Sequence, residues 1–419
     1  RKYARERGKR NEMKQIQGGV TAAKGFEAAG VEAGVKYQNR KDMAMIYSEV
    51  PCKVAGTFTT NIVKAAPVQW DKQIVEHSAF VQAVVVNSGV ANAATGRQGL
   101  ECCKTEAEYT GKLLGIPADA VLVASTGVIG NQLPVDKITA GIEKLAAAKA
   151  ATAEAGLDAA KAIMTTDTVH KQIAVQFEVG GKTATMGAMC KGSGMIHPNM
   201  CTMLGFVTTD VNISKEMLQK AVSAAVVDSF NMISVDGDTS TIDTLLVLAN
   251  GQVDNNEITA AGEDYDAFCE ALSFVTKYLA RKMAGDGEGA TCLFEAKVVG
   301  AATKEDARIL ARSVVSSSLS KAAIYGHDAN FGRFLCALGY SGAVFDPENV
   351  DLYFESQSGK ILIFSKGAAC DYSEEEATKI LSDPEVTILA DMHMGGAEAA
   401  AWGCDLSYDY VKINADYRS

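Results

Sequence analysis

The chain has 419 residues, with 51 Asp and Glu against 40 Lys and Arg, which gives a net charge of −11. This length favours two or three units over one small domain. The acidic balance argues against nucleic-acid binding, which needs a concentrated basic surface. No run approaches the ~18 apolar residues of a membrane span. The basic cluster at residues 1–10 lacks the apolar stretch of a signal peptide, so we expect a frayed terminus there.

Cysteine and histidine usage bears on the compartment and on metal binding. The 10 cysteines are scattered without any CxxC pair, and many lie in apolar segments. Free thiols of this kind are typical of a reducing compartment, so we expect a cytoplasmic protein. The 5 histidines stand apart, with no HxxxH pair and no Cys/His ligand spacing. We therefore expect no metal site.

The first half of the chain alternates short apolar runs with glycine-containing turns. Apolar runs bounded by turn residues predict strands at 43–48, 83–87 and 120–125. Helical periodicity predicts helices at 99–114 and 134–162. Residues 172–192 alternate like a β-hairpin, with Gly180 and Gly181 at its turn.

The second half repeats this alternation. Residues 203–209 predict a buried strand, and a helix follows from Ser214, a favourable N-cap, to Phe230. Further strands are predicted at 243–249 and 293–299, and further helices at 264–284 and 304–315. Thr303 and Asp306 at the start of the last helix are close to a capping box. The class is therefore mixed α and β, although the order of the layers does not follow from the pattern.

The segment KGSGMIHPNMCTMLGFVTTD at residues 191–210 carries the strongest chemical signal. Thr202 lies where a glycine-rich turn meets the start of a buried strand. Its hydroxyl can attack the preceding carbonyl, so that the peptide becomes an ester and is then hydrolysed. The free threonine α-amine that results has a reference pKa of about 7.7–8.0, which suits a base acting on its own hydroxyl. Spacing alone does not separate this role from that of an ordinary threonine at a strand edge.

This segment resembles the processing site of the ornithine acetyltransferase family, also called bifunctional glutamate N-acetyltransferases, in which the motif is KGSGMI-x-PNM-x-TML. Other phrases resemble the family in the same order and extend over nearly the whole chain: GGVTAAKGFEAAGVEAGVK (18–36), FTTNIVKAAPV (58–68), NSGVANAATG (87–96), STGVIG (125–130), IMTTDT (163–168), SVDGDTSTIDT (234–244), DGEGAT (286–291), GHDANFGRFLCALGYSG (326–342) and DYVKINADYRS (409–419). Three positions depart from the family pattern. Cys201, Ile242 and Phe331 stand where a small residue, an asparagine and a tryptophan are commoner.

The resemblance implies a layered α/β sandwich of the ornithine acetyltransferase and N-terminal-nucleophile aminopeptidase type. It also implies cleavage between Cys201 and Thr202, which divides the protein into an alpha chain of residues 1–201 and a beta chain of residues 202–419. The two chains are expected to stay associated, because separation would expose the buried strand after Thr202 at roughly 25 cal/mol per Å². Two such pairs would form an assembly of two alpha and two beta chains.

The resemblance also assigns the site residues. Thr126 and Gly127, in the turn STGVIG, form the oxyanion hole, where loss of one donor costs on the order of 3–4 kcal/mol. Lys191 is a substrate contact whose ammonium can hold a carboxylate, and Glu288 is one whose carboxylate can receive an ammonium. The remaining substrate contacts are Thr165 (with Thr166 as the neighbouring alternative), Thr202, Asn414 and Ser419. Without the family pattern, a plain turn is the better interpretation of STGVIG, and a solvated lysine is the better interpretation of Lys191.

The activity that the resemblance implies is a ping-pong acetyl transfer in arginine biosynthesis. Thr202 takes the acetyl group from N2-acetylornithine and passes it to glutamate, with no metal, nucleotide or other cofactor. Some family members also accept acetyl-CoA, and the sequence leaves open which kind this chain is. Three alternatives stay open: a Thr202 amidohydrolase or aminopeptidase that passes the acyl group to water, a hydrolase built on Cys201, and an uncut non-enzymatic regulator.

Overall fold

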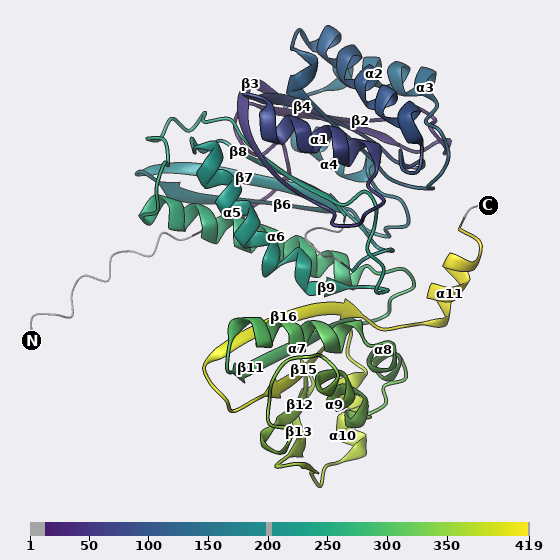
Figure 1. The fold of residues 1–419 in the computed structure, drawn as a ribbon, viewed down its shortest axis with the longest axis vertical. Helices are drawn as coiled ribbons and strands as arrows, with labels where there is room; N and C mark the ends of the chain where they lie inside the picture. The colour runs from purple at the N-terminus through teal and green to yellow at the C-terminus, as the bar shows by residue number, and fades with distance from the viewer. Residues whose placement is uncertain (1–12, 198–202, 418–419) are drawn as a thin grey trace, which may run out of the picture.

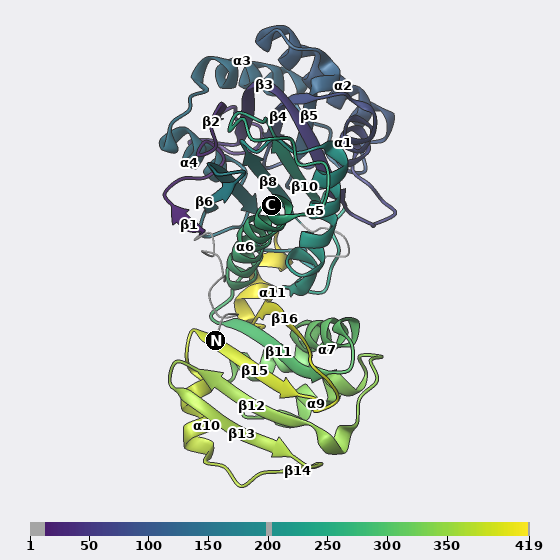
Figure 2. The ribbon, with the colours of Figure 1, turned by 90° about the vertical axis from the view of Figure 1, so that its left-hand side faces the viewer.

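The computed structural model describes residues 13–197 and 203–417 of the chain. The chain forms two β-sheets, and Figures 1 and 2 show them in two lobes stacked along the long axis of the molecule. Strands and helices alternate along most of the sequence. The mixed α and β class that the sequence predicts is therefore confirmed.

The first sheet has the strand order β1-β6-β7-β8-β10-β3-β4-β5, with β2 paired on β3. Its strands are β1 (Lys14–Ile16), β2 (Phe26–Val31), β3 (Met43–Phe58), β4 (Val81–Asn87), β5 (Val121–Ser125), β6 (Lys171–Val179), β7 (Lys182–Lys191), β8 (Leu204–Thr209) and β10 (Thr244–Ala249). β8 lies between β7, to which it is antiparallel, and β10, to which it is parallel. The strand that follows the predicted cleavage point is thus in the interior of the sheet.

The second sheet has the order β14-β13-β12-β15-β11-β16-β9. Its strands are β9 (Ile233–Ser234), β11 (Leu293–Ala301), β12 (Asp351–Ser356), β13 (Gly359–Ser365), β14 (Ala368–Ala369), β15 (Glu385–Asp391) and β16 (Ala397–Cys404). β9 precedes β10 in the chain yet pairs with β16 of this second sheet. The chain therefore passes between the two sheets just before it forms β10.

Helices cover the sheets and separate them. They are α1 (Ala66–His77), α2 (Gly96–Leu114), α3 (Val135–Ala148), α4 (Ala153–Ala162), α5 (Lys215–Val227), α6 (Glu263–Gly285), α7 (Lys304–Ser316), α8 (Ser318–Tyr325), α9 (Phe331–Gly339), α10 (Glu374–Leu381) and α11 (Tyr408–Ala415). α6 contacts β6 and β7 of the first sheet and also β11 and β16 of the second, so it lies between the sheets (Figure 1). α4 packs on β2 and β3, and α7 packs on β11 and β16.

Successive side chains along β3 point to opposite faces of the first sheet, and both faces are buried. Met43 and Met45 face the cluster that contains α2 and α3, whereas Ala44 and Ile46 face the cluster that contains α4. A strand covered on both faces is apolar without interruption, as residues 83–86 of β4 are.

Several local predictions are confirmed. The hairpin of β6 and β7 turns at Gly180 and Gly181, with φ of +57° and +73°, as a two-residue hairpin turn requires. The Ser214 side chain caps α5 and the Thr303 side chain caps α7. Phe230 lies beyond the end of α5, in a single 3-10 turn.

Two predictions are wrong in extent. The helix expected over 134–162 is divided into α3 and α4, because Ala150 pairs with Ala28 beside β2 and Thr152 caps the second helix. The strand expected at 43–48 continues to Phe58 as β3, past the exposed residue Pro51. Tertiary pairing decides the outcome at both places. Within residues 13–197 and 203–417, no helix is both long and apolar enough to cross a bilayer.

The connection between β7 and β8 carries the predicted cleavage point. Lys191 at the end of β7 pairs with Leu204 at the start of β8. Cys201 and Thr202 lie between them and outside the described residues. Met203, the first described residue after them, is buried, and its N–H donates to Asp243 Oδ1 at 2.9 Å.

Candidate active site

A cavity of about 290 Å³ opens where the ends of β5 and β7 meet the turn after α6 and the C-terminal helix α11. Its polar lining comes from Thr126, Thr165, Thr166, Lys191, Ser240, Glu288, Asn414 and Tyr417. Its apolar lining comes from Ala91, Val128, Ile129, Met195 and Ile242. A small molecule that combines charged groups with an apolar segment fits such a lining.

The turn after β5 approaches the turn after β4 very closely. Thr126 N–H donates to the carbonyl of Asn87 at 3.0 Å, and Val128 N–H to that of Gly89 at 3.2 Å. Gly127 has φ of +130°, and a Cβ there would lie 2.3 Å from the Gly89 carbonyl carbon, so glycine is required. Gly127 lines the cavity, and its N–H has no acceptor among residues 13–197 and 203–417. A preorganised N–H on a cavity wall is suited to stabilise an oxyanion.

Lys191 brings a buried cation to the same wall. Its side chain is 7% exposed, and its Nζ lies 3.2 Å from Thr126 Oγ1. Among the described residues, no carboxylate oxygen lies within 4.0 Å of Lys191 Nζ, so it forms no ion pair with them. Burial lowers the pKa of Lys191, and the nearby carboxylate of Asp167 opposes that shift. A buried ammonium without an ion-pair partner can accept an anionic substrate group.

The segment after α4 supplies Thr165 and Thr166. The Arg40 guanidinium donates to the carbonyls of Met164 and Thr165, and the Thr165 N–H donates to Asp167 Oδ2 at 3.1 Å. These bonds fix the main chain of a segment that has no regular secondary structure. Thr165 and Thr166 both line the cavity, so each neighbour weighed from the sequence reaches the site.

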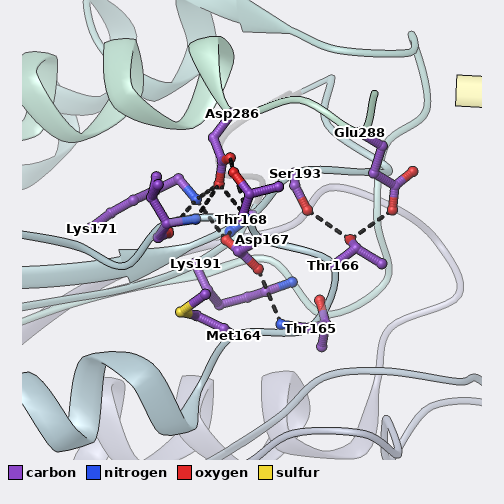
Figure 3. A network of polar contacts seen from close by, with 12 residues as sticks. Met164, Thr165, Thr166, Asp167, Thr168, Lys171, Lys191, Ser193, Asp286 and Glu288 are labelled. Carbon is purple, nitrogen blue, oxygen red and sulfur yellow. Dashed lines mark hydrogen bonds and ion pairs between the residues drawn. The ribbon is translucent and has the colours of Figure 1, made fainter. Parts of the chain in front are cut away.

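Glu288, which follows α6, has both carboxylate oxygens engaged. Thr166 Oγ1 donates to Oε1 at 2.7 Å, and Asn414 Nδ2 donates to Oε2 at 2.7 Å. Thr166 Oγ1 also lies 2.7 Å from Ser193 Oγ, as Figure 3 shows. Gly194 packs against the carboxylate, because a Cβ there would lie 2.4 Å from its atoms. Each oxygen keeps a further lone pair, so the fixed carboxylate can still accept from a substrate ammonium.

A second group of charges lies behind the cavity wall. Lys171 Nζ lies 2.7 Å from Asp167 Oδ1 and 2.6 Å from Asp286 Oδ2, and all three residues are buried (Figure 3). Burial alone would raise the pKa of Asp167, but the Lys191 and Lys171 ammonium groups outweigh it and hold the pKa at about 2. This carboxylate is therefore charged at every physiological pH.

Asp243 is the buried carboxyl group next to the start of β8. Its Oδ1 accepts from Met203 N–H, and its Oδ2 has no partner among the described residues. Burial raises the pKa of Asp243 well above its usual range, although the Met203 bond and the Lys191 charge oppose the shift. Asp243 is thus a buried acid one peptide away from Thr202.

The structure brings most of the sequence-predicted site residues together and leaves others undescribed. Thr126, Gly127, Thr165, Lys191, Glu288 and Asn414 all line the one cavity, although the first and last of them are 288 positions apart in sequence. Cys201, Thr202 and Ser419 lie outside the described residues. Their roles, and those of the cavity residues, stay predictions. The described part of the chain brings no three His, Cys, Asp or Glu side chains together in a metal-binding arrangement.

Sequence reasoning missed Asp167, Lys171, Asp286 and Asp243. Asp167, Asp286 and Asp243 do lie inside the phrases IMTTDT, DGEGAT and SVDGDTSTIDT. That signal could have drawn attention to them, but nothing in the sequence indicates that Lys171 joins two carboxylates 119 positions apart.

Comparison with known proteins places the chain among close relatives. A model described as the ArgJ family matches residues 27–419. An arginine biosynthesis bifunctional protein ArgJ from Symbiobacterium thermophilum is 53% identical over 409 residues, covering 97% of this chain and 100% of that protein. ArgJ 1 from Clostridium acetobutylicum is 51% identical over 401 residues, covering 96% and 97%. The crystal structure of an arginine biosynthesis bifunctional protein from Bacillus halodurans is 46% identical with a TM-score of 0.49, covering 52% of this chain and 100% of that one. The family resemblance carried by the sequence is therefore confirmed, and this chain belongs to the ArgJ family.

Proposed function

We propose that this chain is a self-processing acetyltransferase of arginine biosynthesis, which cleaves the Cys201–Thr202 bond and then carries acetyl from N2-acetylornithine to glutamate on Thr202. The observation that supports this most directly is that one cavity brings together the Lys191 ammonium, the Glu288 carboxylate and Gly127, whose N–H has no acceptor among the described residues. Relatives that are 46–53% identical are named arginine biosynthesis bifunctional proteins. That name is also consistent with use of acetyl-CoA as a second donor.

The charges of the cavity complement those of the proposed donor. N2-acetylornithine carries one carboxylate and one δ-ammonium, separated by an apolar chain. Lys191 is suited to the carboxylate and Glu288 to the ammonium. Glutamate has an α-carboxylate in the same relation to its reacting nitrogen, so one pocket serves both half-reactions.

Self-cleavage is supported by the backbone that follows Thr202. Met203 has φ of +143°, a conformation that residues with a side chain rarely adopt. Its N–H is bound by Asp243 and its carbonyl accepts from Thr244 N–H at 2.7 Å. Backbone strain of this kind gathers at functional sites, and here it lies at the residue after the proposed nucleophile.

The proposed chemistry proceeds by two exchanges of an acyl group. In processing, Thr202 Oγ attacks the Cys201 carbonyl carbon, the C–N bond breaks, and water hydrolyses the ester to leave a free α-amine on Thr202. In turnover, Thr202 Oγ attacks the acetyl carbonyl of acetylornithine, and the proton goes to the departing amine of ornithine. The amine of glutamate then attacks the acetyl ester, the bond from the acetyl carbon to Thr202 Oγ breaks, and the proton lost by the amine returns to Thr202 Oγ as N-acetylglutamate leaves. The Gly127 N–H stabilises the oxyanion in each step.

The two chains are proposed to remain one body after cleavage. β7 from residues 1–201 pairs with β8 from residues 202–419, and β3 pairs with β10 in the same way. Separation would break both ladders and open the core on either face. Pairing of two such bodies, as the family resemblance implies, and action in the cytoplasm complete the proposal. The free cysteines of the described chain support a reducing compartment.

The test is a coupled measurement of ornithine release and N-acetylglutamate formation from N2-acetylornithine, with and without glutamate. The proposal expects both products in equal amounts and little free acetate. Thr202→Ala should lose activity and Cys201→Ala should retain it. Acetate formation without a need for glutamate would identify a hydrolase instead, and loss of activity in Cys201→Ala alone would transfer the chemistry to the cysteine.

A further inference from the structure

The buried group of Asp167, Lys171 and Asp286 lies outside the cavity, and none of the three residues has a role in the chemistry above. The exposed fractions are 9% for Asp167, 2% for Lys171 and 8% for Asp286. The two carboxylates share one lysine at 2.7 and 2.6 Å. Burying three charges carries a large desolvation penalty, which a hydrophobic replacement would avoid. Stability alone therefore does not explain these three charges, and their hydrogen bonds to neighbouring segments indicate a positioning role.

Asp167 binds the main chain on two sides of the cavity. Its Oδ1 accepts from Lys171 Nζ and from the Gly192 N–H at 2.7 Å, and its Oδ2 accepts from the Thr165 N–H at 3.1 Å. Thr165 lines the cavity, and Gly192 is the next residue after Lys191. One carboxylate thus fixes two segments that each supply a cavity residue.

Asp167 is also the carboxylate whose charge acts most strongly on the pKa of Lys191, ahead of Lys171, Asp243 and Glu288. Burial lowers the pKa of Lys191, and Lys171 lowers it further. Asp167 acts in the opposite direction and is itself ionised, with a pKa of about 2. Asp243 is a weaker counterion, because burial raises its pKa well above the usual range.

Asp286 is the second carboxylate bound to Lys171. It accepts from the N–H and the hydroxyl of Thr168 and from Lys171, and among the described residues none of its hydrogen-bond donors lines the cavity. It is not among the principal charges that face Lys191. Asp167 and Asp286 therefore share the same lysine, while Asp167 also accepts from the N–H of Thr165, which lines the cavity (Figure 3).

We propose that Asp167 is a positioning residue for the substrate carboxylate: held in place by Lys171, it sets a buried negative charge at the end of β7, where Lys191 lies, and its hydrogen bonds fix Thr165 of the cavity lining and Gly192, the residue after Lys191. This inference rests on the proposed function, because it takes Lys191 as the group that receives the carboxylate. It adds a residue outside the cavity to the determinants of substrate binding.

The test compares Asp167→Asn with Asp286→Asn. Each change removes one carboxylate charge from the same buried lysine, so the two are expected to destabilise the fold similarly. The readout is the pH profile of kcat/KM in the donor half-reaction, followed as ornithine release. Asp167→Asn should lower the pKa of Lys191, so its alkaline limb should move to lower pH by about 1 unit. KM should rise several-fold, with a smaller change in kcat. Asp286→Asn should keep the wild-type limb.

The inference would be overturned if the alkaline limb of the pH profile shifted equally in the two variants. It would also be overturned if this limb did not shift in a folded Asp167→Asn protein. If Asp167→Asn does not fold, Asp167→Glu gives a second test. It keeps the charge but displaces the carboxylate from the Thr165 and Gly192 N–H groups. The alkaline limb of its pH profile should stay near that of wild type while KM rises, and an unchanged KM would contradict the account. Wild type that releases no ornithine would instead refute the proposed function.

Discussion

Asn414 Nδ2 donates a hydrogen bond of 2.7 Å to Glu288 Oε2, and this bond joins the last helix of the chain to the candidate active site. The bond spans 126 positions in sequence. No residue of α11 is buried, so the helix contributes little to the core. A helix that is marginal for stability and in contact with a site carboxylate is expected to serve binding.

Asn414→Ala should therefore weaken substrate binding without unfolding the protein. A hydrogen bond to a charged group contributes about 1.5–3 kcal/mol, so KM for acetylornithine should rise ~10-fold or more. The melting temperature should stay close to that of wild type. Lys412→Ala on the same exposed helix is the control and should leave KM unchanged. Equal KM values for wild type and Asn414→Ala would remove α11 from the site.

Gly127→Ala should disrupt the turn after β5. The new Cβ would lie 2.3 Å from the Gly89 carbonyl carbon and 2.4 Å from its oxygen, so the two turns must separate. Displacement of the Gly127 N–H should lower turnover by ~10²-fold or more, and the melting temperature should fall. The measurements are steady-state kinetics and thermal unfolding.

Gly130→Ala is the matched control for Gly127→Ala. Gly130 also has a positive φ, of +93°, but an added Cβ would meet no atom of the described residues within 4 Å. It should cost about 1 kcal/mol of backbone strain and leave turnover near wild type. Full activity in Gly127→Ala would show that the turn does not form the oxyanion site.

Because the Glu106 carboxyl group is buried, we expect the free energy of unfolding to decrease as pH rises. It lies fully buried on α2, and burial raises its pKa from 4.5 to about 8, partly offset by a hydrogen bond from Cys102. The unfolded chain releases this proton near pH 4.5 and the folded chain only near pH 8. Stability that is present below pH 4.5 should therefore decrease as pH rises through this window.

In Glu106→Gln, the loss of unfolding free energy between about pH 5 and pH 8 should be smaller than in wild type by a few kcal/mol. Denaturant unfolding at fixed pH values measures it. Glu108→Gln on the exposed side of the same helix is the control and should keep the wild-type slope. Parallel profiles for wild type and Glu106→Gln would indicate that the carboxyl group is hydrated.

Local features of the fold could be predicted wherever the chemistry is local. Gly180 and Gly181 specify their hairpin, and Ser214 and Thr303 specify helix starts, because each acts through its own backbone. The division of 134–162 into two helices could not be predicted, because it depends on the pairing of Ala150 with Ala28. The order of the strands likewise depends on contacts between distant segments.

The candidate site shows the same limit. Thr126, Lys191 and Glu288 could be proposed because they lie in phrases that resemble a known family. Lys171 lies outside these phrases, and Asp243 lies in one of them without a predicted role, because the roles of both arise from burial and from partners elsewhere in the chain. Lys171 matters through Asp286, 115 positions away, and Asp243 through Met203, 40 positions away. No local pattern reports such contacts.

The central claim is that Thr202 becomes a new N-terminus, and the most direct test is intact mass spectrometry of the freshly purified protein beside Thr202→Ala. The account predicts two polypeptides in the wild type, the second of which begins at Thr202. The sum of their masses should exceed the mass of the uncut chain by that of one water molecule. Thr202→Ala should remain a single chain. A single uncut wild-type chain that still transfers acetyl, or a Thr202→Ala protein cut at the same bond, would contradict the account.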